Sequence, residues 1–335
     1  MNRDLGKIWK EIKLSDKQAI FNEVADKIGL PPAAVEKDWW VVRTLEIIFS
    51  TDIAPHTVFK GGTSLSKAWN LIDRFSEDID LALDRKFLGF NTEMTGAQVA
   101  KLRRHSFKFI SEKFFPSLRN AFTNAGFDDL NIKLRKTEAP DQDPLIVELH
   151  YPSVVNKSEY LSPRVLVEIG SRSLIEPFSP KQICSFVGEH FTDQSFADKS
   201  ITISTVNPER TFLEKIFLLH EEFQKPAEKM KVNRLSRHLY DIEKMIGTEF
   251  EKKALGDKKL YEHIVEHRKT ITPLRGIDYA NHAPKKINFI PPFDIIDVWE
   301  KDYKQMQESM IYTESLPFEK LLKRLEDLKK RINNL

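Results

Sequence analysis

The sequence predicts an α+β fold, in which a mixed-sheet core has a helical N-terminal preface and a helical C-terminal lobe. Residues 1–50 carry apolar side chains at helical spacing, residues 56–206 hold several short β-prone runs, and the pattern is helical again beyond Pro208. With 335 residues, 41% of them hydrophobic, the chain is long enough for two cores. We therefore expect two domains, residues 1–207 and residues 208–335.

Charge and cysteine content exclude several classes of protein. The chain has 52 Lys and Arg against 50 Asp and Glu, so a nucleic-acid partner must meet a local basic patch rather than a global excess. The single cysteine, Cys184, excludes an internal disulfide and a zinc site of paired cysteines. It suits a reducing cytoplasm, where we expect the protein. No uncharged apolar run is long enough for a membrane span, so we expect no membrane partner.

The preface is predicted to be helical on the spacing of its apolar residues. Ile20, Val24 and Ile28 recur every four residues, and Pro31-Pro32 interrupts the pattern before an apolar stretch from Val35 to Phe49. This periodicity predicts at least two helices.

A strand, a tight turn and a helix are predicted next. Thr57 to Phe59 is β-prone, the run stops at Gly61-Gly62, and Ser64 to Ile72 places its apolar residues on one helical face. The following stretch, Arg74 to Leu83, alternates apolar and polar residues and predicts a strand. Two glycines thus lie between a strand and a helix, directly before a second strand.

The rest of the chain completes the sheet and then turns helical. Residues 97–124 read as helix, and residues 101–119 within them hold six Lys and Arg against one acid. Further strands are expected at 131–135, 145–151, 164–169 and 200–206, and helices at 211–224, 234–246 and in two final segments. Leu321, Leu325, Leu328 and Ile332 of the last helix are expected to dock on their own domain.

Two aspartates on the predicted strand are the first candidates for chemistry. Asp78 and Asp80 stand two residues apart, so both carboxylates project from one face and can reach a pair of divalent cations. A strand that alternates buried and solvent-exposed residues has the same pattern. When two aspartates at this spacing are the sole signal, that is the commoner explanation. The preceding turn changes that balance.

The turn Gly61-Gly62-Thr63-Ser64 has the composition of a phosphate site. Glycines let a phosphate approach the backbone, while helix N–H groups and hydroxyls can donate to it. An ordinary helix cap by Thr63 or Ser64 is the alternative. A phosphate cradle beside a metal-binding pair of acids is what a nucleoside triphosphate requires, so the two elements together predict such a site.

A third carboxylate is needed to complete the metal site and to accept the proton of an attacking hydroxyl. Glu168 is the lone charge in the apolar run Val165 to Ile169 and is our choice. Glu148, in the run Leu145 to Leu149, is the competing residue. A structural ion pair with an arginine such as Arg172 remains an alternative for either.

The segment from Phe59 to Leu83 closely resembles the motif of the AbiEii/AbiGii family of nucleotidyltransferase-like toxins, in the DNA polymerase β-like nucleotidyltransferase superfamily. Other segments are similar to the family's further motifs: VEKDWW from Val35, VLVEIGSRS from Val165, RTFLEKIFLLHEE from Arg210 and RLSRHLYDIEKM from Arg234. The resemblance spans nearly the whole chain.

The resemblance implies a role for each matching residue. Asp78 and Asp80 would bind the metals, with Glu168 as third acid. Lys215, and Arg237 one helical turn before Asp241, would belong to the nucleotide site, and Asp241 would be the last active-site acid. Gly61, Gly62, Thr63 and Ser64 would hold the triphosphate. From the residues alone, a surface lysine is the usual interpretation of Lys215, and Arg237 and Asp241 have the spacing of an ordinary ion pair.

The resemblance also implies an activity. It indicates transfer of a nucleoside monophosphate from a nucleoside triphosphate, with Mg²⁺ or Mn²⁺, to RNA and in particular the 3′ end of tRNA. The protein would then be the toxin of a bacterial toxin–antitoxin or phage-defence system, opposed by a separately encoded antitoxin. Transfer to a protein or small molecule, and a silent nucleotide- or RNA-binding module, are the alternatives. The basic stretches 101–119 and 229–238 are the predicted RNA contacts.

Overall fold

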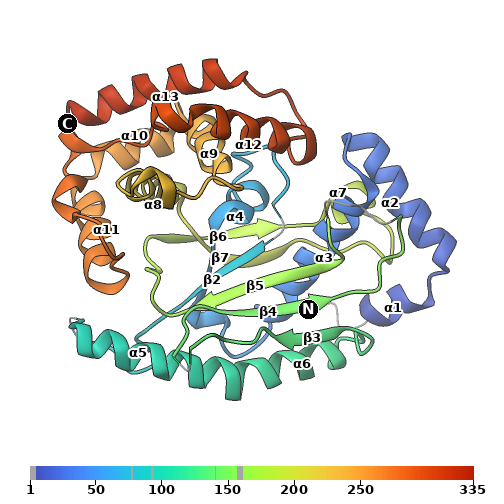
Figure 1. Ribbon diagram of the computed structural model, residues 1–335. Coiled ribbons are helices and arrows are strands. Elements are labelled where there is room, and N and C mark those ends of the chain that lie inside the picture. Colours follow the sequence, from blue (N-terminus) through green and yellow to red (C-terminus); the bar gives the residue numbers. More distant parts are fainter. Residues whose placement is uncertain (1–4, 77, 92–93, 140, 157–160) are drawn as a thin grey trace. The chain divides into compact units, whose positions relative to one another are not determined.

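The computed structural model describes residues 5–76, 78–91, 94–139, 141–156 and 161–335, and these residues include a seven-stranded mixed β-sheet (Figure 1). The fold is α+β, as predicted. The chain divides into a first unit, Met1–Trp69 with Phe75–Val206, and a second unit, Asn70–Arg74 with Asn207–Leu335. The predicted domain boundary at Pro208 stays a prediction.

The sheet belongs to the first unit and has the strand order β3-β4-β5-β2-β1-β7-β6. Strand β2 pairs in parallel with β5 and antiparallel with β1, and β1 pairs in parallel with β7. The remaining neighbours are antiparallel. The strands are β1 (Thr57–Lys60), β2 (Asp78–Leu83), β3 (Asn131–Leu134), β4 (Leu145–His150), β5 (Arg164–Gly170), β6 (Phe178–Ile183) and β7 (Ile201–Val206).

The two faces of this sheet differ because side chains alternate along each strand. Ile79, Val147 and Val167 point to a buried face, against which α3 packs, whereas Asp80 and Glu168 on the other face are half-buried. Antiparallel and mixed sheets commonly have one apolar and one wet face. The charged residues of the central strands therefore share the less buried face of the sheet.

The described part of the first unit contains seven α-helices. The three N-terminal ones confirm the predicted preface, and α3 carries Trp39, which stacks on Trp9 of α1. Helix α6 packs against α3. The helices are α1 (Leu5–Glu11), α2 (Leu14–Ile28), α3 (Pro32–Ile48), α4 (Gly61–Lys67), α5 (Gly96–Phe109), α6 (Phe115–Asn124) and α7 (Phe186–His190), with a π-helical turn, Ile110–Phe114, joining α5 to α6.

Helix α4 is displaced from its predicted range. It begins at Gly61 rather than Ser64 and ends at Lys67, well before Ile72. Asn70 has a φ of 50°, which a continuing right-handed helix does not allow. The prediction of a longer helix was wrong because residues 70–74 leave the first unit and pack with the second.

Two strand predictions also differ from the structure. Strand β2 begins at Asp78 and not at Arg74, and Glu77 of the predicted strand lies outside the described residues. Strand β6 was not predicted, because Pro180 interrupts its β-prone pattern. As the last strand in the order, β6 tolerates a proline that a central strand would not.

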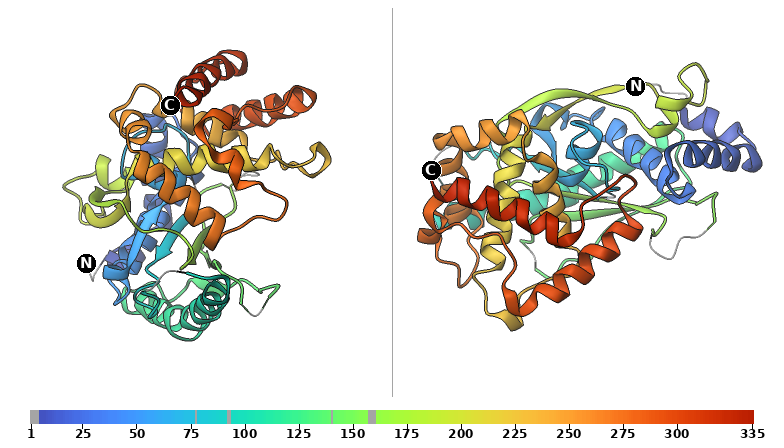
Figure 2. Two further views of the ribbon diagram at one scale, coloured as in Figure 1. Left: turned by 90° about the vertical axis from the view of Figure 1, so that its left-hand side faces the viewer. Right: turned by 90° about the horizontal axis from the view of Figure 1, so that it is seen from above.

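The second unit is helical in its described residues, as predicted. Helices α8 and α9 are central to it: α10 and α11 pack on α8, while α12 and α13 pack on α9 and on each other (Figure 2). No described helix is long and apolar enough to span a membrane. The helices are α8 (Pro208–Glu222), α9 (Ser236–Met245), α10 (Glu249–Gly256), α11 (Lys258–Ile271), α12 (Ile296–Ser309) and α13 (Phe318–Asn333).

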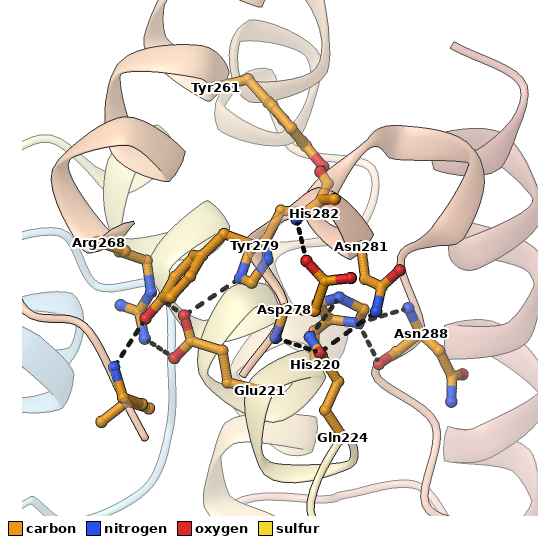
Figure 3. Close-up of polar contacts among 12 residues, drawn as sticks. His220, Glu221, Gln224, Tyr261, Arg268, Asp278, Tyr279, Asn281, His282 and Asn288 are labelled. Atoms are coloured by element: carbon orange, nitrogen blue, oxygen red, sulfur yellow. Dashed lines mark hydrogen bonds and ion pairs between the residues drawn. The ribbon is translucent and has the colours of Figure 1, made fainter. Parts of the chain in front are cut away.

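Two features hold these helices together. The apolar row of α13, which includes Leu321 and Leu325, is buried within the chain, so this helix docks on its own unit as expected. Buried Glu221 of α8 accepts two hydrogen bonds from Arg268 of α11 and lies 3.1 Å from Nε2 of His282 (Figure 3). Charge and hydrogen bonds thus fix α11 and the following loop onto α8.

Candidate active site

The row of residues across three central strands places the predicted acids together. Asp80 of β2 lies opposite Lys60 of β1 on one side and opposite Glu168 of β5 on the other. Neighbouring strands are about 4.8 Å apart, and residues directly opposite share a face. Asp78, two residues before Asp80, is on this face as well. The structure therefore brings Asp78, Asp80 and Glu168 onto one face of adjacent strands.

The electrostatics of Glu168 fit a cation site. Burial raises the pKa of its carboxyl above the usual range, and the neighbouring carboxylates of Asp80 and Asp78 raise it further, while Lys60 opposes them. A cluster of like charges that repel one another is relieved by a bound divalent cation, for which carboxylate oxygens are suitable ligands. The donor set thus fits Mg²⁺ or Mn²⁺.

The arrangement is not a closed metal cage. Among the residues that the structure describes, no three His, Cys, Asp or Glu side chains are grouped closely enough to hold a metal ion. Magnesium sites of phosphate-transferring enzymes commonly use one or two carboxylates and complete their coordination with water and substrate phosphates. The three acids are consistent with such an open site, and metal binding by them stays a prediction.

Glu148 occupies a different position on the same face. It lies opposite Leu166, which in turn lies opposite Asp78, so one strand separates it from the aspartates. Its carboxylate is 2.6 Å from Nε of Arg135 and 3.0 Å from Nε2 of His150. Although burial alone would raise its pKa, these partners hold the pKa below the usual range. Geometry and charge therefore favour Glu168 over Glu148 as the third acid.

The turn before α4 presses against the second aspartate. Gly61 has a φ of +82°, and a Cβ at this position would overlap the carboxylate of Asp80. Only glycine combines that backbone conformation with so close an approach. Gly62 follows in the first turn of α4 and is half-buried. The predicted phosphate turn and the predicted metal ligand are thus in direct contact.

The hydroxyls of this turn are used within the fold. Thr63 donates to the main-chain carbonyl of Asp78 and lies 2.9 Å from the Ser76 hydroxyl, and Ser64 donates to the Gly61 carbonyl at 2.9 Å. Thr63 and Ser64 are buried. Thr63 therefore links the turn to the start of β2, whereas Ser64 closes the turn on itself, and the contact of either hydroxyl with a triphosphate stays a prediction.

A second cluster of predicted residues lies within the helical unit. The carboxylate of Asp241 on α9 receives two hydrogen bonds from Arg74, at 2.6 and 2.8 Å, and is 2.8 Å from Nζ of Lys215 on α8. Asp241 is completely buried and Lys215 is 6% exposed, which excludes a surface position for this lysine. The structure thus joins Lys215 and Asp241, and adds Arg74.

The charges of this cluster are set by mutual contact. Burial would raise the pKa of Asp241, but Arg74 and Lys215 more than offset it and hold the carboxyl well below its usual range. Burial and the charges of Lys215 and Arg237 lower the pKa of His238 far below its usual value. His238 is therefore neutral, and its Nδ1 lies 3.3 Å from Nζ of Lys215. Arg237 adds positive charge to this cluster.

Several site residues were missed from the sequence. Arg74 precedes the acid motif, and the sole signal was one arginine in a stretch read as strand. Lys60 is the residue before the two glycines, and no local pattern distinguishes it from an ordinary lysine at the end of a strand. In the VEKDWW segment, Asp38 of α3 is 2.9 Å from Nζ of Lys67 and accepts from the Phe186 amide at 2.8 Å, so it ties α4 to α3.

Comparison with known proteins identifies a matching family. A family model described as nucleotidyl transferase AbiEii toxin, type IV toxin–antitoxin system, matches residues 44–324. A search of curated proteins finds none that matches. The crystal structure of JHP933 from Helicobacter pylori is similar with a TM-score of 0.41 and 15% sequence identity, covering 88% of this chain and 90% of that chain.

Proposed function

Because the chain belongs to the AbiEii family of nucleotidyl transferase toxins of type IV toxin–antitoxin systems, we propose that it is a metal-dependent nucleotidyltransferase whose acceptor is RNA. The nucleoside monophosphate of a nucleoside triphosphate passes to an acceptor hydroxyl, and the 3′ end of tRNA is the proposed acceptor. Membership of a toxin family implies a separate antitoxin as partner. We further propose a role in phage defence in the cytoplasm.

The observation that carries this proposal is the row Lys60, Asp80 and Glu168 with Gly61 against the Asp80 carboxylate. Two carboxylates on adjacent strands next to a glycine turn combine cation ligands with a surface that a phosphate can approach. A strand whose polar face is simply exposed to solvent, which is the alternative explanation, requires neither the contact of Gly61 with Asp80 nor a third acid in register.

In the proposed reaction the oxygen of the acceptor hydroxyl attacks the α-phosphorus, the bond to the β-phosphate oxygen breaks, and pyrophosphate leaves. Glu168 accepts the hydroxyl proton, a role for which its raised pKa is suited. Asp78, Asp80 and Glu168 would hold Mg²⁺ or Mn²⁺, which when bound would supply neutralisation of the triphosphate charge. Lys60 lies in the same row and adds a positive charge.

The residues of the helical unit have a second role in the proposal. Lys215 contacts the nucleotide phosphates, Arg237 assists it, and Asp241 orients Lys215. Two observations support this role for Lys215. Its Nζ lies 2.8 Å from the Asp241 carboxylate, and a lysine held by a carboxylate is already positioned before an anion binds. In addition to burial, the charges of Lys215 and Arg237 lower the pKa of His238, so the surroundings of this residue are positive.

A labelling experiment tests the proposal. The purified protein is incubated with Mg²⁺ or Mn²⁺, bulk tRNA and each α-labelled nucleoside triphosphate in turn. We expect label on tRNA with the wild-type protein and with Asp129→Asn, an exposed control, but none with Asp80→Asn. Label on a protein band alone would contradict RNA as the acceptor. Equal labelling by the wild type and Asp80→Asn would contradict the assigned site.

A further inference from the structure

Asp78, Asp80 and Glu168, which we call the acid row, have a group of basic residues beside them on the same face of the sheet. Lys133 of β3 is opposite Glu148 of β4, and Arg164 of β5 is opposite His150 of β4. The Arg135 amide donates to the Ile146 carbonyl and so continues the pairing of β3 by one residue. We call Lys133, Arg135, His150 and Arg164, arranged around Glu148, the basic patch.

Exposure and charge distinguish the patch from the buried ion pairs of the molecule. The side chains of Arg135 and Arg164 are 40% and 38% exposed, and Lys133 is exposed. Three permanent cations stand against the single carboxylate of Glu148, so the patch is positive at neutral pH.

Glu148 organises the patch without using up its donors. It contacts Arg135 through Nε at 2.6 Å, which leaves the terminal amino groups of that guanidinium outside this contact, and it is 3.7 Å from a terminal nitrogen of Arg164. Planar guanidinium groups bind phosphate through paired N–H donors. The carboxylate therefore orders two arginines that can still donate to an anion.

The place of the patch indicates which anion it meets. Glu148 is two strand spacings, about 10 Å, from Asp78, a span that a nucleic-acid strand covers in a few nucleotides. Half-buried Ile146 and Leu166 lie on the same face and offer apolar contacts to bases. A positively charged surface that follows the phosphate backbone is a common element of proteins that bind single-stranded nucleic acid.

We propose that the basic patch binds the phosphate backbone of the RNA acceptor and leads its terminal hydroxyl to the acid row. This inference rests on the proposed transfer to RNA and identifies where the acceptor lies. It differs from the sequence-based expectation that the helical stretch 101–119 makes these contacts, since those basic residues stand on α5, the π-helical turn and α6 rather than in the strand rows that hold the acids.

Charge-neutralising variants test the inference through RNA binding in the absence of nucleotide. The patch variant is Lys133→Gln/Arg135→Gln/Arg164→Gln, and the matched control, on α5, is Lys101→Gln/Arg104→Gln/Lys108→Gln. Affinity for bulk tRNA is measured by filter binding across a series of salt concentrations. Each phosphate contact changes log K by about 0.7 per tenfold change in salt, or about fivefold at 0.1 M salt relative to 1 M.

We expect the patch variant to bind tRNA about a hundredfold more weakly at 0.1 M salt, with a salt slope smaller by about 2. The α5 control should change neither value. Because the patch variant exposes Glu148, a second variant, Glu148→Gln, is measured as well, and it should bind tRNA more tightly than the wild type. A misfolded patch does not produce that gain.

Three results would overturn the inference: wild-type affinity in the patch variant, an equal loss in the α5 control, or no tRNA binding by the wild type. Failure of the proposed function is a separate result. If the wild-type protein binds tRNA through the patch but transfers no label to it in the labelling experiment, the transfer proposal is wrong and the binding surface stands.

Discussion

Loss of the Asp241 carboxylate should strongly destabilise the helical unit. Asp241→Asn removes the charge that faces both Arg74 and Lys215, whose side chains are only 2% and 7% exposed. Removing one partner of a buried ion pair costs about 3–5 kcal/mol, because the remaining charge stays buried and uncompensated. Here two cations lose their partner, so we expect a loss of unfolding free energy at the upper end of that range.

The dependence on pH follows from the direction of the Asp241 pKa. Arg74 and Lys215 hold this pKa well below its usual range, so the carboxylate stabilises the fold above the unfolded-state pKa of about 3.9. That stabilisation is lost as the pH falls through the lower pKa of the folded state. The Asn variant lacks it at every pH, so its deficit should be full at pH 7 and shrink in strong acid.

Urea unfolding followed by circular dichroism measures the loss, and hydrogen exchange of α8 and α9 amides locates it. The exposed Asp294→Asn variant serves as control and should stay within about 0.5 kcal/mol of the wild type. An unfolding free energy for Asp241→Asn within about 1 kcal/mol of the wild type would refute the reasoning. It would mean that Asp241 serves binding or catalysis alone.

Three further predictions concern single residues. Gly61→Ala should strain the backbone by about 1–2 kcal/mol and displace the Asp80 carboxylate, lowering label transfer about a hundredfold, whereas Gly89→Ala, with a φ of +87° and open space around it, should keep the activity. Glu221→Gln should lower the unfolding free energy at pH 7 by about 3 kcal/mol in urea titrations, and because the pKa of this carboxyl is lowered in the fold, the wild-type advantage should vanish as the pH falls through that pKa. Burial and the nearby Asp198 carboxylate raise the pKa of Cys184 to about 12, so maleimide at pH 8 should label it only in denaturant, as read by mass spectrometry; labelling of the native protein would contradict this.

Local patterns made most of the fold predictable. The preface, the helical lobe and the central strands follow from apolar periodicity, which depends on which face of an element is buried. Strand β6 escaped because Pro180 is tolerated at the last position of the sheet, which no local pattern reveals. The end of α4 escaped for a related reason: residues 70–74 pack with a part of the chain more than a hundred residues away.

In the candidate site, too, some features follow from local patterns and others depend on contacts between distant parts of the sequence. Asp78 and Asp80 were predictable because two-residue spacing on a strand fixes a shared face. Glu168 was chosen over Glu148 from the sequence, although either acid fits its own local pattern, and the strand order adds that Glu168 is the one in register with Asp80. The contact of Arg74 with Asp241 spans 167 residues of sequence and was not predictable from either segment alone.

Anomalous diffraction from crystals grown with Mn²⁺ and a non-hydrolysable nucleoside triphosphate would test most directly that the acid row is the catalytic centre. We predict Mn²⁺ bound by Asp78 and Asp80 with Glu168 beside it, and triphosphate oxygens against the Gly61 turn. Mn²⁺ and triphosphate bound elsewhere, with these carboxylates unliganded, would contradict the assignment.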